Sequence, residues 1–191
     1  MTRMEKRYTF VMTHPLTAPR WFLQGLKTLQ KVKLCHRNLS LENVLIRGDV
    51  CYISSLGLSL RVPVSEDGTV LKLMPQAVCG KKPEYIAPEV FQNEPFDGYA
   101  VDLWAAGVML CQMLFGGDVM FSAPIPEDPK FQEICIHGHL KAVVDKFQAL
   151  VTDQKAVSDA AIDLLQRMLR ADPAERLTLS EVQEHPWFKD G

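Results

Sequence analysis

Residues 35–46, CHRNLSLENVLI, place several polar side chains capable of chemistry in one short run bounded by apolar residues. Asn38 and Asn43 carry amides, which can hydrogen-bond a hydroxyl group or offer a neutral oxygen to a cation. An amide carries no negative charge and is no useful base near neutral pH. The run therefore raises the question whether it is a working catalytic loop or the scaffold of one whose chemistry has gone.

Secondary-structure elements that hold this run in place can be predicted on both sides of it. Before it, apolar residues recur at helical spacing, which predicts a helix over residues 21–34. After it, NVLI and VCYISS are short β-prone runs separated by RGD, which predicts a small hairpin whose residues 44–46 form a core strand. From about residue 57 to residue 88 clear periodicity is lacking, so we expect an irregular segment that is functional or disordered.

The rest of the chain predicts helices. Residues 101–115, VDLWAAGVMLCQMLF, are apolar on nearly every side of a helical wheel, which predicts a central buried helix too short to span a bilayer. Ser158 is placed to cap a following helix, and Thr178 with Glu181 forms a capping box for a last short helix. The predicted fold class is therefore mainly α with a small β hairpin.

Composition sets broad limits on the kind of protein. The chain has 191 residues, of which 47% are apolar and 23% charged, as expected for one soluble globular domain. Its formal net charge of −2 gives no reason to expect nucleic acid or a membrane as partner. Five scattered cysteines indicate free thiols, and a signal-like or membrane-spanning apolar stretch is lacking, so we expect a cytoplasmic or nuclear protein.

Several motifs follow one another in an order that points to one family. HRNLSLEN resembles the loop His-Arg-Asp-Leu-x-x-x-x-Asn, SLG stands where Asp-Phe-Gly would be, and YIAPEV contains Ala-Pro-Glu. DLWAAG, DPAER and HPWF follow at family-like spacing. Together they resemble the C-terminal lobe of a eukaryotic protein kinase of the Ser/Thr branch, over about residues 21–188. We therefore expect residues 21–191 to form this lobe, and residues 1–20 to be a leader or a hinge remnant.

The resemblance implies structural roles for four residues and places Arg37 among the residues of the catalytic site. In the family, the Glu of Ala-Pro-Glu pairs with an Arg near the end of the domain, which here implies a pair between Glu89 and Arg176. Asp102 should accept backbone N–H groups of the loop, with His36 packed below it. Arg37 stands where the family grips an activating phosphate. These positions imply that the scaffold of the loop is intact.

The resemblance also assigns the catalytic positions, and here the sequence departs from the family. Asn38 replaces the aspartate that orients the substrate hydroxyl and accepts its proton, and Ser55 replaces the aspartate that binds Mg²⁺. Asn43 keeps the place of the second metal ligand, although it can equally brace the loop. Ser40 replaces a lysine that touches the transferred phosphate, and Leu45 would contribute to a nucleotide site. Neutral oxygens are poor ligands for Mg²⁺, so we expect impaired catalysis.

The upper lobe of a kinase supplies a Gly-rich loop and a strand lysine, and neither G-x-G-x-x-G nor Val-Ala-x-Lys occurs in the sequence. We therefore expect no cofactor for this chain, and ATP with Mg²⁺ only if an upper lobe exists. Three hypotheses follow: a pseudokinase-like binding or scaffolding module in phosphorylation signalling, an active Ser/Thr kinase represented by a truncated or faulty chain, or a degenerate fragment.

Partners are indicated only weakly by the sequence. Under the first hypothesis we expect protein partners, and neither nucleic acid nor a membrane. Glu42 stands where some kinases contact basic substrate residues, which indicates basic peptides, although a solvated glutamate explains it as well.

Overall fold

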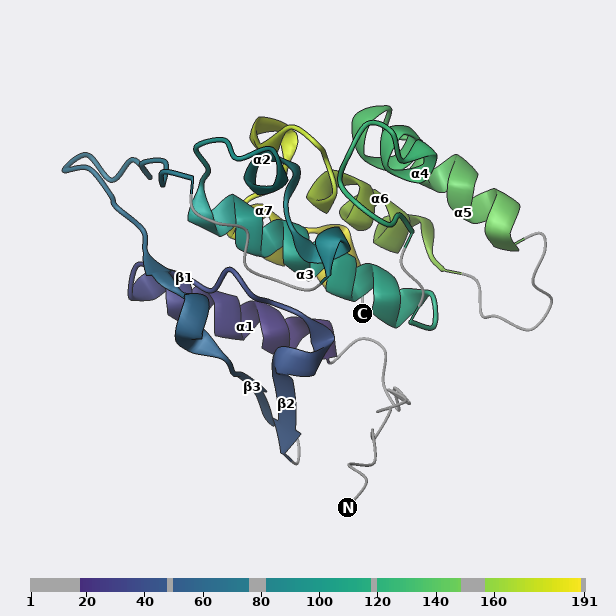
Figure 1. Ribbon diagram of the computed structural model, residues 1–191. Coiled ribbons are helices and arrows are strands. Elements are labelled where there is room, and N and C mark those ends of the chain that lie inside the picture. Colours follow the sequence, from purple (N-terminus) through teal and green to yellow (C-terminus); the bar gives the residue numbers. More distant parts are fainter. Residues whose placement is uncertain (1–17, 48–49, 76–81, 118–119, 149–156, 190–191) are drawn as a thin grey trace, which may run out of the picture.

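The computed structural model describes residues 18–47, 50–75, 82–117, 120–148 and 157–189, and helices dominate this part of the chain (Figure 1). The α-helices are α1 (Ala18–Lys31), α2 (Pro88–Phe91), α3 (Gly98–Leu114), α4 (Pro129–Phe131), α5 (Leu140–Gln148), α6 (Asp159–Met168), α7 (Leu179–Glu184) and α8 (Pro186–Lys189). Short 3₁₀ turns are η1 (Leu41–Asn43), η2 (Leu56–Leu58), η3 (Pro83–Tyr85) and η5 (Pro173–Glu175), and a π turn is η4 (Gln132–Ile136). Helix α3 runs through the middle of the molecule, with α1 on one side and α4 to α6 on the other.

The strands form two antiparallel pairs. β2 (Val44–Arg47) pairs with β3 (Val50–Ile53), which confirms the predicted hairpin. A second pair, β1 (Leu34–Cys35) with β4 (Leu60–Arg61), was not predicted. The mainly α fold class with a small β hairpin is thus confirmed. Of the leader predicted at residues 1–20, residues 1–17 lie outside the described part of the chain, and residues 18–20 belong to α1.

The segment after η2 has more order than its lack of periodicity indicated. Single antiparallel bridges join Val64 to Val70 and Leu73 to Phe96. Its pairings are too short to leave a period-2 pattern in the sequence, which is why the sequence reading missed them. Residues 76–81 lie outside the described part of the chain.

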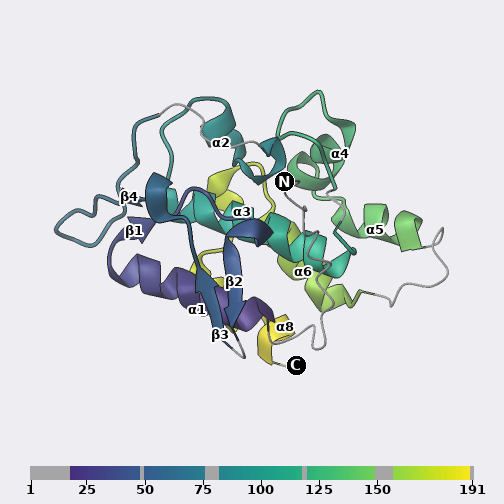
Figure 2. The same ribbon diagram turned by 60° about the horizontal axis from the view of Figure 1, so that its bottom comes forward.

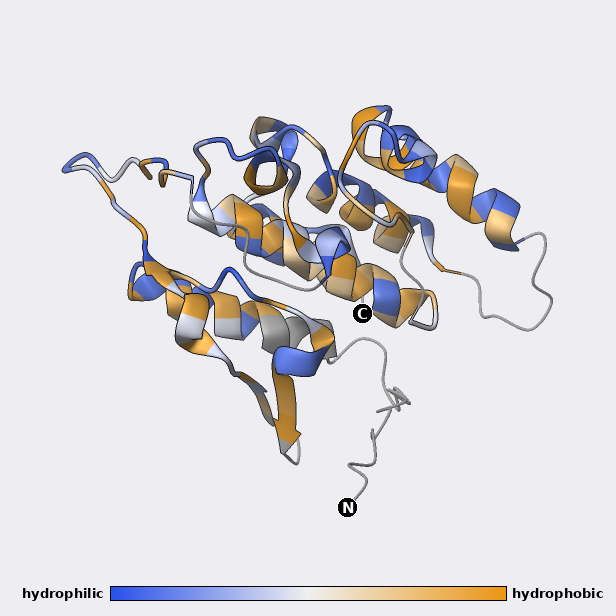
Figure 3. Cartoon of the chain, in the orientation of Figure 1, coloured by the Kyte–Doolittle hydropathy of each residue, from blue (hydrophilic) through white to orange (hydrophobic). Residues whose placement is uncertain are grey.

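The hairpin is less buried than expected. Leu45 is 54% exposed and Ile46 is 48% exposed, so the prediction that residues 44–46 form a core strand is wrong for these two. β3 packs on α1, where Ile53 fills the space left by Gly25. The hairpin points away from the helical body, and its apolar residues are visible as orange strands in the hydropathy view (Figure 3).

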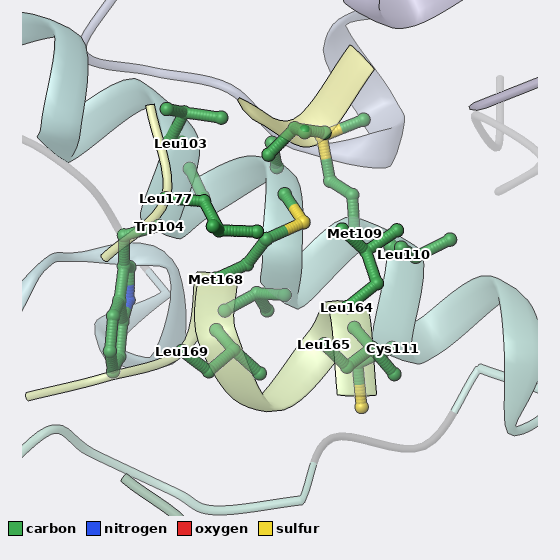
Figure 4. Packing of buried hydrophobic residues seen from close by; sticks show 14 of the residues in the cluster. Leu103, Trp104, Met109, Leu110, Cys111, Leu164, Leu165, Met168, Leu169 and Leu177 are labelled. Carbon is green, nitrogen blue, oxygen red and sulfur yellow. The ribbon is translucent and has the colours of Figure 1, made fainter. Parts of the chain in front are cut away.

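Helix α3 forms the centre of the core, as the sequence predicted. Trp104 is fully buried and donates its indole N–H to the Glu84 carbonyl at 3.2 Å. Figure 4 shows residues of α3 facing those of α6, including Met109 and Leu165. At Gly107 α3 comes close to the end of α6, and an added Cβ would lie 2.9 Å from a side-chain methyl group of Leu169, which would have to move. Among the described helices, none is long and apolar enough to cross a membrane.

The predicted helix ends are confirmed in part. Ser158 accepts a hydrogen bond from the Ala161 amide at the start of α6, and Thr178 forms the predicted capping box with Glu181 at the start of α7. The first helix spans 18–31 rather than 21–34, because Lys33 adopts a positive φ of 56° and the chain then enters β1. Helix α8, which follows α7 beside α1 and α6 in Figure 2, was not predicted.

Candidate functional site

Asp102, near the start of α3, holds the loop at residues 35–43 from below. Its two carboxylate oxygens accept the backbone N–H groups of His36 at 2.6 Å and of Arg37 at 2.8 Å. Arg37 has a φ of 64°, a left-handed conformation that costs a non-glycine residue of order 1–3 kcal/mol. These two charge-assisted bonds stabilise that backbone conformation.

His36 is fully buried and braces the loop against the hairpin. Its Nε2 lies 2.8 Å from the Ser54 carbonyl, and its Nδ1 accepts the Asn38 backbone N–H at 3.2 Å. Nδ1 is thus an acceptor, so the ring is neutral and Nε2 carries the proton. Burial lowers the pKa of His36 and raises that of Asp102 to about 7, although the two N–H bonds to Asp102 oppose its shift. The predicted roles of both residues agree with this geometry.

Glu89 and Arg176 form the buried ion pair expected from the motif series. The Nη1 and Nη2 nitrogens of the guanidinium each donate to one carboxylate oxygen at 2.7 Å, and Glu89 and Arg176 are 5% and 6% exposed. The guanidinium also lies over the Trp104 ring, 5.0 Å from its centroid. This pair joins α2 to the segment before α7, two parts of the chain that are far apart in the sequence.

Asn38, Asn43 and Ser55, which the sequence analysis placed at the catalytic and metal positions, lie near one another. The Asn38 amide nitrogen lies 3.4 Å from the Ser55 hydroxyl oxygen, and the Asn43 side chain donates to the Asn38 carbonyl at 2.7 Å. Ser55 also has a left-handed backbone, with a φ of 69°. Asn43 thus braces the loop, which was the alternative to its role as a metal ligand.

The donor set at this convergence is a poor fit to a Mg²⁺–nucleotide complex. It offers two amides and one hydroxyl, all neutral, whereas Mg²⁺ prefers anionic oxygen. Within the described ranges, groups of three or more His, Cys, Asp or Glu side chains that could hold a metal ion are absent. Asn38, Asn43 and Ser55 therefore do not fit a Mg²⁺ site of the kind that phosphoryl transfer uses.

The other predicted site residues lie differently. Ser40 is buried, its backbone carbonyl accepts the Asn43 N–H at 3.0 Å, and it is one of the residues that line the cavity described below. Leu45 lies on the exposed face of the hairpin. The Arg37 guanidinium lies 5.6 Å from the centroid of the Phe96 ring, a contact that the sequence did not indicate.

A cavity of about 490 Å³ opens beside the loop, between it and the start of α3. Asn38, Glu42, Lys82 and Tyr85 are among its lining residues. The Lys82 ammonium lies 2.9 Å from the Glu42 carboxylate and 5.9 Å from the centroid of the Tyr85 ring. Sequence reasoning identified Glu42 but missed Tyr85, and the pairing with Lys82 spans forty residues and left no local signal.

Tyr85 is a rigid wall of this cavity. Its hydroxyl donates to the Gln112 side chain of α3, and its ring is buried. Burial raises the pKa of Tyr85 to about 12, so its hydroxyl stays protonated at neutral pH. Tyr85 is therefore a neutral aromatic surface held in place from α3.

Comparison with known proteins agrees with the motif series. A model of the protein kinase domain matches residues 5–188, and so begins within the predicted leader. The serine/threonine-protein kinase SRK2C of Arabidopsis thaliana is 34% identical over 177 residues, which cover 88% of this chain and 47% of that protein.

Two cereal proteins give the same result. Serine/threonine-protein kinase SAPK9 of Oryza sativa subsp. japonica is 32% identical over 179 residues, covering 88% of this chain and 44% of that protein. An abscisic acid-inducible protein kinase of Triticum aestivum is 34% identical over 176 residues, covering 88% and 48%. The chain spans about half the length of the curated relatives it matches. The motifs, the loop scaffold and these matches lead to one conclusion: the chain belongs to the eukaryotic protein kinase family, in its Ser/Thr branch.

Proposed function

We propose that the chain is a catalytically impaired protein kinase homologue, a pseudokinase-like C-terminal lobe over residues 21–191 that serves as a protein-binding module in phosphorylation signalling. The observation that carries this proposal is the convergence of Asn38, Asn43 and Ser55 without a carboxylate. The loop that should perform the chemistry keeps its scaffold, through Asp102 and His36, and lacks its charges.

The missing charges affect both parts of the reaction. Phosphoryl transfer needs a carboxylate to orient and accept the proton of the substrate hydroxyl, and metal-bound phosphates to spread the developing charge. The Asn38 amide can orient a hydroxyl but cannot take its proton near neutral pH. Ser55 offers a hydroxyl that is already within reach of the Asn38 amide. Both losses fall on the same reaction, so efficient transfer is not expected.

The binding role rests on the cavity beside the loop. An opening of about 490 Å³ is in the size range of ligand sites, and side chains of a docked peptide fit such a volume. Its acidic lining residues are Asp102, which is satisfied by backbone N–H groups, and Glu42, whose side chain is exposed to solvent. Arg37 and Lys82 line the cavity as well, and we propose a basic segment of a partner protein as the ligand, with Glu42 as its acidic contact.

A transfer assay tests the catalytic part of this proposal. The chain is incubated with radiolabelled ATP and Mg²⁺, and incorporation into a Ser/Thr peptide mixture and into the chain itself is measured. We expect no incorporation above that of an Asp102→Asn control, in which the loop scaffold is disturbed. Incorporation clearly above this control, and abolished by Asn38→Ala, would overturn the proposal.

A second candidate function is an ATP-dependent Ser/Thr kinase of which this chain is a part. Two observations favour it: the chain spans about half the length of its relatives, and the ion pair of Glu89 with Arg176 is intact. Under this hypothesis, fusing the relatives' additional kinase-domain sequence to this chain gives transfer activity without change at Asn38 or Ser55. Under the first proposal, the fusion gains activity only when Asn38→Asp and Ser55→Asp are introduced together.

A further inference from the structure

We propose that Lys82 is an internal occupant of a cation site formed by Glu42 and Tyr85, and that a basic residue of a partner must displace it to bind. This inference rests on the proposed binding function and adds to it a specific competitor within the chain. Lys82 would thereby affect how tightly a partner binds in the cavity and which of the partner's side chains can enter it.

The contacts of Lys82 have the geometry of cation recognition. Its ammonium lies 2.9 Å from a Glu42 oxygen, a normal distance for a charge-assisted bond. It also lies 5.9 Å from the centroid of the Tyr85 ring, within the range of a cation–π contact. A carboxylate and an aromatic face together select a cationic group, and here the occupant is part of the same chain.

The aromatic wall of the site is held in place by the helical body of the protein. Tyr85 is fixed by its hydrogen bond to Gln112, and Glu42 lies in η1, directly between Leu41 and Asn43 of the braced loop. The Lys82 side chain is partly exposed and reaches Glu42 with its flexible end, while the Lys82 backbone carbonyl accepts the Tyr85 N–H at 3.2 Å. Because Lys82 is tethered beside Glu42, it competes at a high effective concentration and weakens any external ligand.

The occupant we propose for the emptied site is an arginine or lysine of an extended peptide. An arginine guanidinium can bond both carboxylate oxygens and stack on an aromatic face, whereas an ammonium acts as a point charge. Asn38 and Glu42 both line the cavity, so a peptide whose basic residue reaches Glu42 would lie beside the loop.

The test uses the full chain and a fluorescent peptide that contains two arginines, beside the same peptide with citrulline at both positions. Citrulline has a similar shape but no charge. Lys82→Met removes the ammonium and keeps an apolar side chain. Lys72→Met is the matched control, since Lys72 is an exposed lysine that does not line the cavity.

We expect the arginine peptide to bind Lys82→Met about two- to fivefold more tightly than the wild type, the range that a partly exposed ion pair supports. Lys72→Met should bind as the wild type does, and the citrulline peptide should show no gain. Adding Glu42→Gln to Lys82→Met should abolish the gain. Equal or weaker binding by Lys82→Met, or an equal gain with citrulline, overturns the inference.

A second measurement does not need a peptide of the right sequence. Mass spectrometry after brief treatment with an amine-acylating reagent reports how fast each lysine reacts. We expect Lys82 to react more slowly than Lys72 in the wild type, and Glu42→Gln to speed up Lys82 alone. Equal acylation rates of Lys82 and Lys72 in the wild type would refute the occupancy of the cation site by Lys82. Transfer activity in the radiolabelled ATP assay would refute the proposed function but would not change the acylation result.

Discussion

The buried pair of Glu89 and Arg176 gives the sharpest stability prediction. Replacing Glu89 by alanine removes two bonds of 2.7 Å to the guanidinium and leaves a positive charge that is 6% exposed. Breaking a buried pair in this way costs about 3–5 kcal/mol. Arg176 keeps bonds to the carbonyls of Arg170 at 2.7 Å and Ala171 at 3.0 Å, which places the expected loss in the free energy of unfolding near the lower end, about 3 kcal/mol.

Equilibrium unfolding in urea, followed by circular dichroism, measures this loss in the free energy of unfolding. In a thermal melt of a chain of this size, the same loss of about 3 kcal/mol lowers the melting temperature by about 6–12 °C. Glu175→Ala is a matched control, because Glu175 also accepts from an arginine, Arg170, at 2.7 Å but is exposed. Its expected cost is about 0.2–1 kcal/mol.

A double variant separates the stranded charge from the lost contact. Combining Glu89→Leu with Arg176→Met removes both charges and keeps apolar volume, and buried pairs replaced in this way are often neutral in stability. We therefore expect the double variant to be more stable than Glu89→Ala. If Glu89→Ala cost no more than Glu175→Ala, the reasoning that burial makes this pair important would be refuted.

Three further predictions follow from the loop, a cap and the hairpin. Burial raises the pKa of Asp102 from 3.8 to about 7, so the folded state binds more protons between these values. The difference in free energy of unfolding between the wild type and Asp102→Asn should therefore fall as the pH rises from 3.8 to about 7, as measured by urea unfolding across this range. A rise of this difference with pH would contradict the prediction. Thr178→Ala should cost about 1 kcal/mol in the same assay by removing a capping box, while Ser180→Ala, in the same exposed turn, should cost less than about 0.5 kcal/mol. Leu45→Ser should change stability by less than about 0.5 kcal/mol because the side chain is exposed, and a loss of 2 kcal/mol or more, about that of a core leucine, would show that this face is buried.

Much of the fold could be predicted from the sequence where local chemistry decides the structure. The capping box at Thr178 and the cap at Ser158 are local patterns, and both formed as expected. The central helix could be predicted because its sequence is apolar on nearly every side, and such a helix must be buried. The scaffold of the loop, in which Asp102 accepts the backbone N–H groups of His36 and Arg37, was expected from an ordered series of motifs.

What could not be predicted depends on contacts between distant segments. The exposure of Leu45 depends on which elements cover the hairpin, and an apolar strand alone does not reveal this. The pairing of Leu73 with Phe96 is too short to impose a period on the sequence. The contact of Lys82 with Glu42 joins two charged residues forty positions apart, and each alone is typical of a solvated surface.

Asn38, Asn43 and Ser55 present neutral groups at one place in the loop, and we propose that they no longer bind a metal–nucleotide complex. The most direct measurement is the shift in melting temperature of the wild-type chain on adding ATP, with and without Mg²⁺, beside the Ser55→Asp variant. Because a ligand that binds only the folded state raises its stability, we expect no Mg²⁺-dependent shift in the wild type. A saturable, Mg²⁺-dependent rise in the wild type, as large as that in Ser55→Asp, would contradict the claim.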